Sequence, residues 1–166
     1  MSELTMIGKS KNGCDVFADL ESSHAATHFN DSPKLFDAVK KVIPLIALDK
    51  EKVRVEIDTA EVVGTSDLVE THQGDEIVYA MRPYRDRYSR FVKNRLAEET
   101  SWIVLSFERL NQEQYKLYTA FVGRLTPSFP GGDFMPEMSN EFWATHALVL
   151  GNQEVIPGSE TDVCPW

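Results

Sequence analysis

The chain of 166 residues is 42% hydrophobic and 26% charged, which is typical of one globular domain rather than of a disordered chain. Its net charge of −9 argues against broad, sequence-independent binding to nucleic acid, because such binding depends on neutralising phosphates. The apolar runs are too short to span a membrane, and no basic segment followed by an apolar run opens the sequence. The distant cysteines Cys14 and Cys164 are typical of reduced thiols, so we expect a cytoplasmic protein.

The first third of the sequence predicts a strand, a polar segment and one amphipathic helix. Residues 14–20 indicate a short strand, and residues 22–28 predict a loop or a single helical turn. A capping residue followed by Pro33 marks a helix start. Pro44 should kink or end this helix early. The apolar face of the helix is predicted to consist of Leu35, Val39, Val42, Ile43 and Ile46.

The remainder of the chain favours short strands. Alternation at residues 53–57 predicts one strand, and residues 101–108 and 115–122 predict a hairpin. Further strands are expected at residues 62–63, 68–69, 77–81, 88–93 and 142–150. We therefore expect an α+β fold in which the early helix packs on a curved, mainly antiparallel sheet. The prediction is a single domain over residues 1–166, with its core at about 14–150 and an irregular tail at 151–166.

Residues 82–95 concentrate the positive charge of this acidic protein. They contain six basic residues and one acidic residue, whereas the rest of the chain has 11 basic and 25 acidic residues. One basic strip on an acidic body indicates a localised anion site. The competing interpretation is a solvated segment that pairs with the protein's own acids.

The side chains of this basic strip suit a phosphate-bearing ligand. If residues 88–93 form a strand, Tyr88 and Arg90 share one face and Phe91 points to the core. A guanidinium matches the geometry of phosphate, and a tyrosine ring can stack on a base. Arg82, Arg87, Tyr88 and Arg90 are therefore candidate ligand-binding residues.

Two histidines near the first helix are candidates for acid–base chemistry. His24 and His28 are four residues apart, which on a helix places both rings on one side. A metal pair is one interpretation, although the zincin glutamate and an obvious third ligand are missing. Acid–base chemistry is favoured, because imidazole titrates near neutral pH. His146 lies in an apolar run that is typical of a core histidine.

The late stretch Tyr118-Thr119-Ala120-Phe121 reads as the end of a central strand. Strand alternation predicts that Tyr118 and Ala120 face one side, and Thr119 and Phe121 the other. Taken alone, each residue is an ordinary strand former.

The expected order of elements is a His-bearing loop, an amphipathic helix and an antiparallel sheet, with this stretch on a late strand. This order resembles the barnase–EndoU–colicin–RelE superfamily of metal-independent ribonucleases. The resemblance covers about residues 22–123, and Phe121 stands where the family pattern has tyrosine. It implies RNA cleavage through the ribose 2′-hydroxyl without metal or cofactor. It further implies that His24 or His28 supplies acid–base chemistry, that Arg90 holds the phosphate, and that Tyr118 or Thr119 positions it.

The first hypothesis is therefore a toxin-like endoribonuclease that acts on RNA. The alternative is a non-catalytic bacterial or phage accessory module that docks an acidic protein partner or a nucleotide through residues 82–95. A metal-dependent enzyme that uses His24 and His28 is a third interpretation. The sequence alone leaves open whether the protein is an enzyme, and it does not define the oligomeric state.

Overall fold

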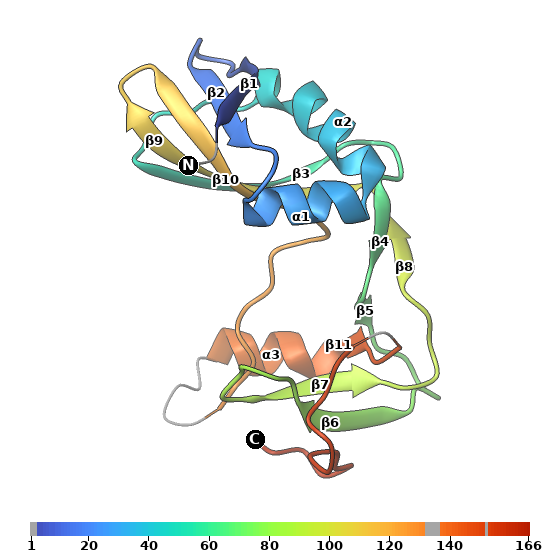
Figure 1. Ribbon diagram of the computed structural model, residues 1–166. Coiled ribbons are helices and arrows are strands. Elements are labelled where there is room, and N and C mark those ends of the chain that lie inside the picture. The colour runs from blue at the N-terminus through green and yellow to red at the C-terminus, as the bar shows by residue number, and fades with distance from the viewer. Residues whose placement is uncertain (1–2, 132–136, 152) are drawn as a thin grey trace. The chain divides into compact units, whose positions relative to one another are not determined.

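The computed structural model describes residues 3–131, 137–151 and 153–166, and it divides the chain into two compact units (Figure 1). Unit 1 comprises Met1–Thr65 and Glu99–Leu125, and unit 2 comprises Ser66–Glu98 and Thr126–Trp166. Helices and mainly antiparallel sheets occur together, which confirms the predicted α+β class. No helix in the described part of the chain is long and apolar enough to cross a membrane.

Unit 1 is built on a five-stranded sheet with the order β1-β2-β10-β9-β3. The neighbouring strands are antiparallel except for β2 and β10, which run parallel. The predicted hairpin is confirmed as β9–β10, and the predicted strand at residues 53–57 is confirmed as β3. The strand bounds are β1 Leu4–Lys9, β2 Asp15–Asp19, β3 Lys52–Asp58, β9 Trp102–Asn111 and β10 Gln114–Val122.

Two helices precede β3. Helix α1, His24–Asp31, begins where the Ser23 hydroxyl accepts a hydrogen bond of 3.0 Å from the Ala26 amide, so the segment predicted as a loop or one turn continues into a longer helix. Helix α2, Pro33–Val42, starts at the predicted proline. It ends before Pro44, which lies in the 3₁₀ turn Ile43–Leu45, as predicted.

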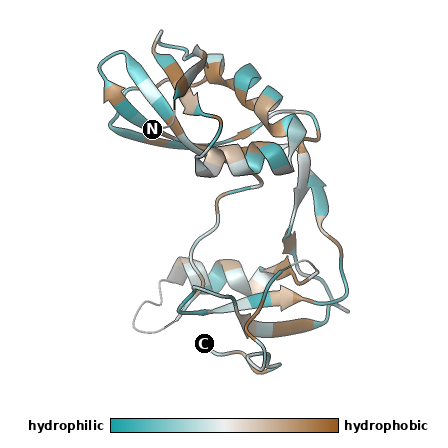
Figure 2. Ribbon diagram, in the orientation of Figure 1, coloured by the Kyte–Doolittle hydropathy of each residue, from teal (hydrophilic) through white to brown (hydrophobic). Residues whose placement is uncertain are grey.

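One hydrophobic core holds unit 1 together. The apolar face of α2, with Leu35 and Val39 fully buried, packs with the alternate β9 residues Ile103, Leu105 and Phe107. The predicted packing of the amphipathic helix on the sheet is therefore confirmed. Figure 2 shows apolar and polar residues alternating along α2.

A bulge in β10 changes the predicted direction of Tyr118. The strand register shifts between Leu117 and Thr119, so Tyr118 has no direct partner on β9. Tyr118 is 55% exposed, whereas Ala120 is fully buried. The prediction that these two side chains share a face was therefore wrong, because one extra residue reverses the alternation.

Unit 2 contains a four-stranded sheet with the order β5-β11-β7-β6. Strand β11 is parallel to β7, and the other pairs are antiparallel. Its buried residues form two small clusters, one around Val92 and Val149 and one around Phe91. The strand bounds are β5 Leu68–Glu70, β6 Ile77–Met81, β7 Tyr88–Val92 and β11 His146–Val149. A further pair, β4 Gly64–Ser66 and β8 Glu98–Thr100, forms where the chain passes from one unit to the other.

The predicted strand at residues 142–150 is wrong in its first part. Helix α3, Glu137–Thr145, includes Phe142 and the fully buried Trp143, and only His146–Val149 forms a strand. A short apolar run cannot be assigned to helix or strand by periodicity alone. Trp143 is fixed by a hydrogen bond of 3.1 Å from its indole nitrogen to the Pro127 carbonyl. The described part of residues 151–166 contains no helix or named strand.

Candidate functional site

The candidate residues are divided between the two units. Unit 1 contains His24, His28, Tyr118 and Thr119, and unit 2 contains Arg82, Arg87, Tyr88 and Arg90. His24 is the first residue of α1, and its side chain lies outside the described part of the structure. Each set therefore lies within a single unit.

In unit 1, α1 brings His28 alongside the second half of β10. Strand β2 pairs with β10 over residues 114–116, and α1 packs against β10. The half-buried His28 ring lies 6.3 Å from the ring of Phe121, measured between centroids. Phe121 is two residues beyond Thr119, a step of roughly 7 Å along a strand. The structure therefore places His28 beside Phe121, two residues along β10 from Thr119.

Thr119 belongs to a polar row that crosses three strands. Its partner on β9 is Ser106, and the partner of Ser106 on β3 is Arg54. The core residues Leu105 and Ala120 alternate with this row, so it lies on the sheet face that points away from the core. Directly opposed residues have Cβ atoms about 5 Å apart, which places two hydroxyls and a guanidinium in one line.

Arg54 is the functional candidate that the sequence interpretation missed. Its side chain is exposed, and it makes no hydrogen bond or ion pair with any residue that the structure describes. The alternation Val53-Arg54-Val55 indicates that Arg54 points away from the core. Only the long-range register places it in the row of Thr119.

The neighbouring charges on this sheet face are largely paired. Lys52 lies 3.9 Å from Glu108, and Lys116 is opposite Glu108 in the register. Arg124 forms an ion pair of 2.9 Å with Glu56, and its guanidinium lies 3.8 Å from the Trp102 ring centroid. Hydrogen bonding from Arg124 lowers the pKa of Glu56. Among the described residues, neither Arg54 nor Lys116 on this face forms an ion pair, and Arg54 is the one that shares the row of Thr119.

In unit 2, the first part of the basic strip is anchored to its surroundings. Arg82 donates a hydrogen bond of 2.9 Å from Nε to the buried hydroxyl of Ser89, and its guanidinium lies 5.7 Å from the Phe129 ring centroid. Burial lowers the pKa of the Arg82 guanidinium. Arg87 donates a hydrogen bond of 3.1 Å to the Phe129 carbonyl. Both arginines therefore contact Phe129, in the segment that enters unit 2 after Leu125.

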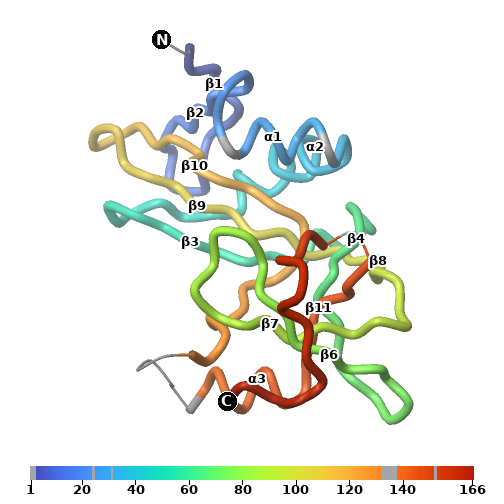
Figure 3. Tube along the Cα trace, turned by 60° about the horizontal axis from the view of Figure 1, so that its bottom comes forward, coloured from blue at the N-terminus to red at the C-terminus, as the bar shows by residue number. Residues whose placement is uncertain are grey.

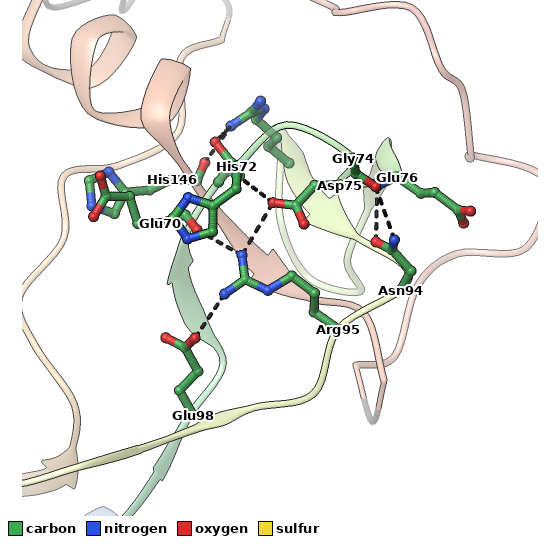
Figure 4. A network of polar contacts seen from close by, with 11 residues as sticks. Glu70, His72, Gly74, Asp75, Glu76, Asn94, Arg95, Glu98 and His146 are labelled. Atoms are coloured by element: carbon green, nitrogen blue, oxygen red, sulfur yellow. Dashed lines mark hydrogen bonds and ion pairs between the residues drawn. The ribbon is translucent and has the colours of Figure 1, made fainter.

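The later arginines of the strip bind main-chain carbonyls. Arg90 Nη1 donates to the His146 carbonyl at 2.9 Å and to the Thr71 hydroxyl at 3.4 Å. Arg95 donates to the Glu70 carbonyl at 2.7 Å and pairs with Asp75 at 3.2 Å and with Glu98 at 2.8 Å (Figure 4). The Asp75 carboxylate also accepts the His72 amide at 2.7 Å. These contacts support the interpretation that the strip stabilises the protein's own surface.

The predicted orientation of β7 is confirmed for its central residues. Phe91 is fully buried, whereas Tyr88 and Arg90 are half-buried. The turn between β6 and β7 is more exposed than the strand. Tyr84 is fully exposed and adopts a φ of 62°, and Arg85 beside it is exposed. A positive φ is uncommon for a bulky residue.

The two histidines of unit 2 differ in their surroundings, since His146 is hydrogen-bonded and stacked and His72 is exposed. His146 Nδ1 lies 3.0 Å from the Phe142 carbonyl and 2.9 Å from the Thr145 hydroxyl, and its ring stacks on Phe142. His72 is exposed. Within the described ranges, no group of three or more His, Cys, Asp or Glu side chains is arranged to hold a metal ion.

Two cavities of unit 1 lie away from the candidate residues. One has a volume of about 490 Å³ and is lined by Lys9, Asp15, Arg109 and Glu113, among others. The other has a volume of about 200 Å³ and lies between α2 and residues 59–63. The row around Thr119 is therefore part of a sheet face and does not line either cavity.

Comparison with known proteins adds no assignment. The chain matches no protein-family model, no curated protein and no solved structure.

Proposed function

We propose that the protein is a metal-independent endoribonuclease that acts on RNA in the cytoplasm and whose chemistry is carried by unit 1. The observation that carries the proposal is the row of Thr119, Ser106 and Arg54 across three strands, with His28 beside Phe121 two residues along β10. An extended sheet face suits a polymer, whose backbone can lie along the strands. The resemblance to metal-independent ribonucleases points to the same reaction.

The reaction requires two proton transfers and stabilisation of a charged phosphorane. A base accepts the 2′-hydroxyl proton as the 2′-oxygen bonds to phosphorus, and an acid protonates the departing 5′-oxygen as its bond to phosphorus breaks. His28 supplies one of these roles, and His24, at the start of the same helix, is the candidate for the other. Thr119 positions the phosphate by hydrogen bonding.

Arg54 is proposed to contact the phosphate. Arg90, the candidate expected for this role, donates from Nη1 to the His146 carbonyl and the Thr71 hydroxyl within unit 2. Arg54 lies in the row of Thr119 and makes no polar contact within the described part of the chain. A fixed cation near the developing negative charge stabilises the transition state.

The test is RNA cleavage by the purified full-length chain in EDTA. Cleavage with a 2′,3′-cyclic phosphate end is expected for the wild type. His28→Ala should reduce the rate by about 100-fold or more, since positioned acids and bases contribute on that scale. Arg54→Ala should reduce it by about 100-fold.

The matched control is Lys34→Ala, which removes an exposed cation on α2 that is not part of the proposed site. Its cleavage rate should equal that of the wild type. Intact RNA after prolonged incubation with excess wild-type protein would contradict the proposal.

A second candidate function rests on the turn between β6 and β7. Tyr84 combines full exposure with a φ of 62°. Strained backbone of this kind costs about 1–3 kcal/mol and clusters at binding sites. In this candidate, the protein is a non-catalytic module that uses Tyr84 and Arg85 to bind a nucleotide or an acidic partner.

Binding of a fluorescent 2′-O-methyl RNA oligonucleotide distinguishes the two candidates. Tyr84→Gly keeps the backbone conformation accessible but removes the ring, and it should weaken binding by about tenfold if the ring stacks on a base. Arg85→Ala should act similarly, whereas His28→Ala should have no effect. Unchanged affinity of both turn variants would exclude the turn as an RNA-binding site.

A further inference from the structure

Residues 156–166, here called the strap, run beside β6, the outer strand of the unit 2 sheet (Figure 3). The amides of Tyr79 and Thr161 each donate a hydrogen bond of 2.8 Å to the other's carbonyl. The Ile156 amide donates to the Met81 carbonyl at 2.8 Å, and the Met81 amide donates to the Ser159 hydroxyl at 3.0 Å. The strap thus satisfies backbone groups that an edge strand would otherwise expose.

The end of the strap lies against aromatic side chains. The Trp166 ring meets the Tyr79 ring edge-on at 5.2 Å and lies 6.2 Å from the Phe129 ring. Phe129 in turn stacks on Trp143 at 3.8 Å. Burial raises the pKa of the Tyr79 hydroxyl, and a side-chain hydrogen bond with Cys164 acts in the same direction. Trp166 and Cys164 therefore cover Tyr79, which is only 9% exposed.

The strap is held by few contacts compared with a strand of the sheet. It makes one antiparallel bridge, and a serine hydroxyl takes the place of a main-chain carbonyl at Met81. Val163 is 70% exposed and Ile156 is 41% exposed, so neither anchors the strap by burial. Cys164 is a free thiol and adds no covalent link. The strap should therefore open without opening β6–β7.

We propose that the β6 edge is a docking site for an extended segment of a partner protein, and that the strap occupies this site until the partner displaces it. The strap defines the chemistry of the occupant. It has a hydroxyl side chain two residues before the bridging residue and an aromatic side chain five residues after it, as Ser159, Thr161 and Trp166 show. Main-chain hydrogen bonds supply affinity at such an edge, and the aromatic contact supplies specificity.

Peptide binding to the full-length protein tests the proposal. The probe is a fluorescent peptide with the sequence of residues 154–166, and the readout is anisotropy. Trp166→Ala loosens the protein's own strap, so the peptide should bind this variant at least tenfold more tightly than the wild type. A peptide carrying Thr161→Pro lacks the donor to the Tyr79 carbonyl and should not bind.

Hydrogen exchange provides the second measurement. The Tyr79 and Met81 amides should exchange at least tenfold faster in Trp166→Ala than in the wild type, with the β7 amides unchanged. Thr161→Pro in the full-length chain should give the same pattern. The proposal is overturned if the peptide binds neither form, or if the Tyr79 amide exchanges only as fast as the amides of β7 in every variant.

Discussion

At the scale of single residues, the arginines of the basic strip act as cross-links between distant segments. Arg90 reaches the His146 carbonyl, and Arg95 reaches the Glu70 carbonyl. The arginines of the strip donate to main-chain carbonyls as often as they pair with carboxylates. The number of acidic residues in the sequence therefore could not identify their partners. The charge pattern predicted where the arginines lie, but the direction of each side chain depends on contacts that are far apart in sequence.

Asp75 is the residue through which this network should respond to pH. Its pKa is lowered by the hydrogen bond from the His72 amide and further by Arg95. A carboxyl whose pKa is lower in the folded state stabilises the protein above its unfolded pKa, about 3.9, and this stabilisation is lost as the pH falls through the folded value. Asp75→Asn should therefore lower the unfolding midpoint of unit 2 at pH 7, and the difference from wild type should shrink below about pH 4.

Denaturant unfolding monitored by tryptophan fluorescence at several pH values measures this effect, since Trp143 and Trp166 lie in unit 2. The control is Glu76→Gln, which changes the adjacent, exposed acid. If Asp75→Asn gives the same midpoint as wild type at pH 7, the Arg95 network does not stabilise this unit.

At the scale of elements, local sequence signals were reliable where one residue type has a strong backbone preference. Pro33 and Pro44 bracketed α2, and alternation identified β3 and the β9–β10 hairpin. Proline fixes φ and removes a donor, so its effect on a helix does not depend on distant contacts.

Elements whose form depends on tertiary packing were not predictable in the same way. Residues 142–145 are apolar enough for a strand, yet they complete α3, where Trp143 is buried and bonded to the Pro127 carbonyl. The β10 bulge at Tyr118 reversed the predicted facing because alternation assumes an unbroken register. The candidate row of Thr119, Ser106 and Arg54 likewise required the register of three strands.

At the scale of the whole molecule, the chain alternates between the two units. Residues 66–98 leave unit 1 to form most of the unit 2 sheet, and residues 126–166 return to complete it with α3 and β11. The large core cluster consists of unit 1 residues only, and the two smaller clusters consist of unit 2 residues only. The single domain expected from the length stays a prediction, and the separate cores make it testable.

The test compares one large-to-small substitution in each core. Leu35 and Phe91 are both fully buried, so Leu35→Ala should cost about 2–5 kcal/mol and Phe91→Ala about 3–5 kcal/mol. Because the clusters share no residue, each substitution should accelerate hydrogen exchange mainly within its own unit, in peptides from residues 4–58 and 102–122 for Leu35→Ala and from residues 68–92 and 137–149 for Phe91→Ala. If both substitutions instead accelerate exchange equally throughout the chain, the two cores unfold as one cooperative domain, and the clusters are parts of a single folding unit.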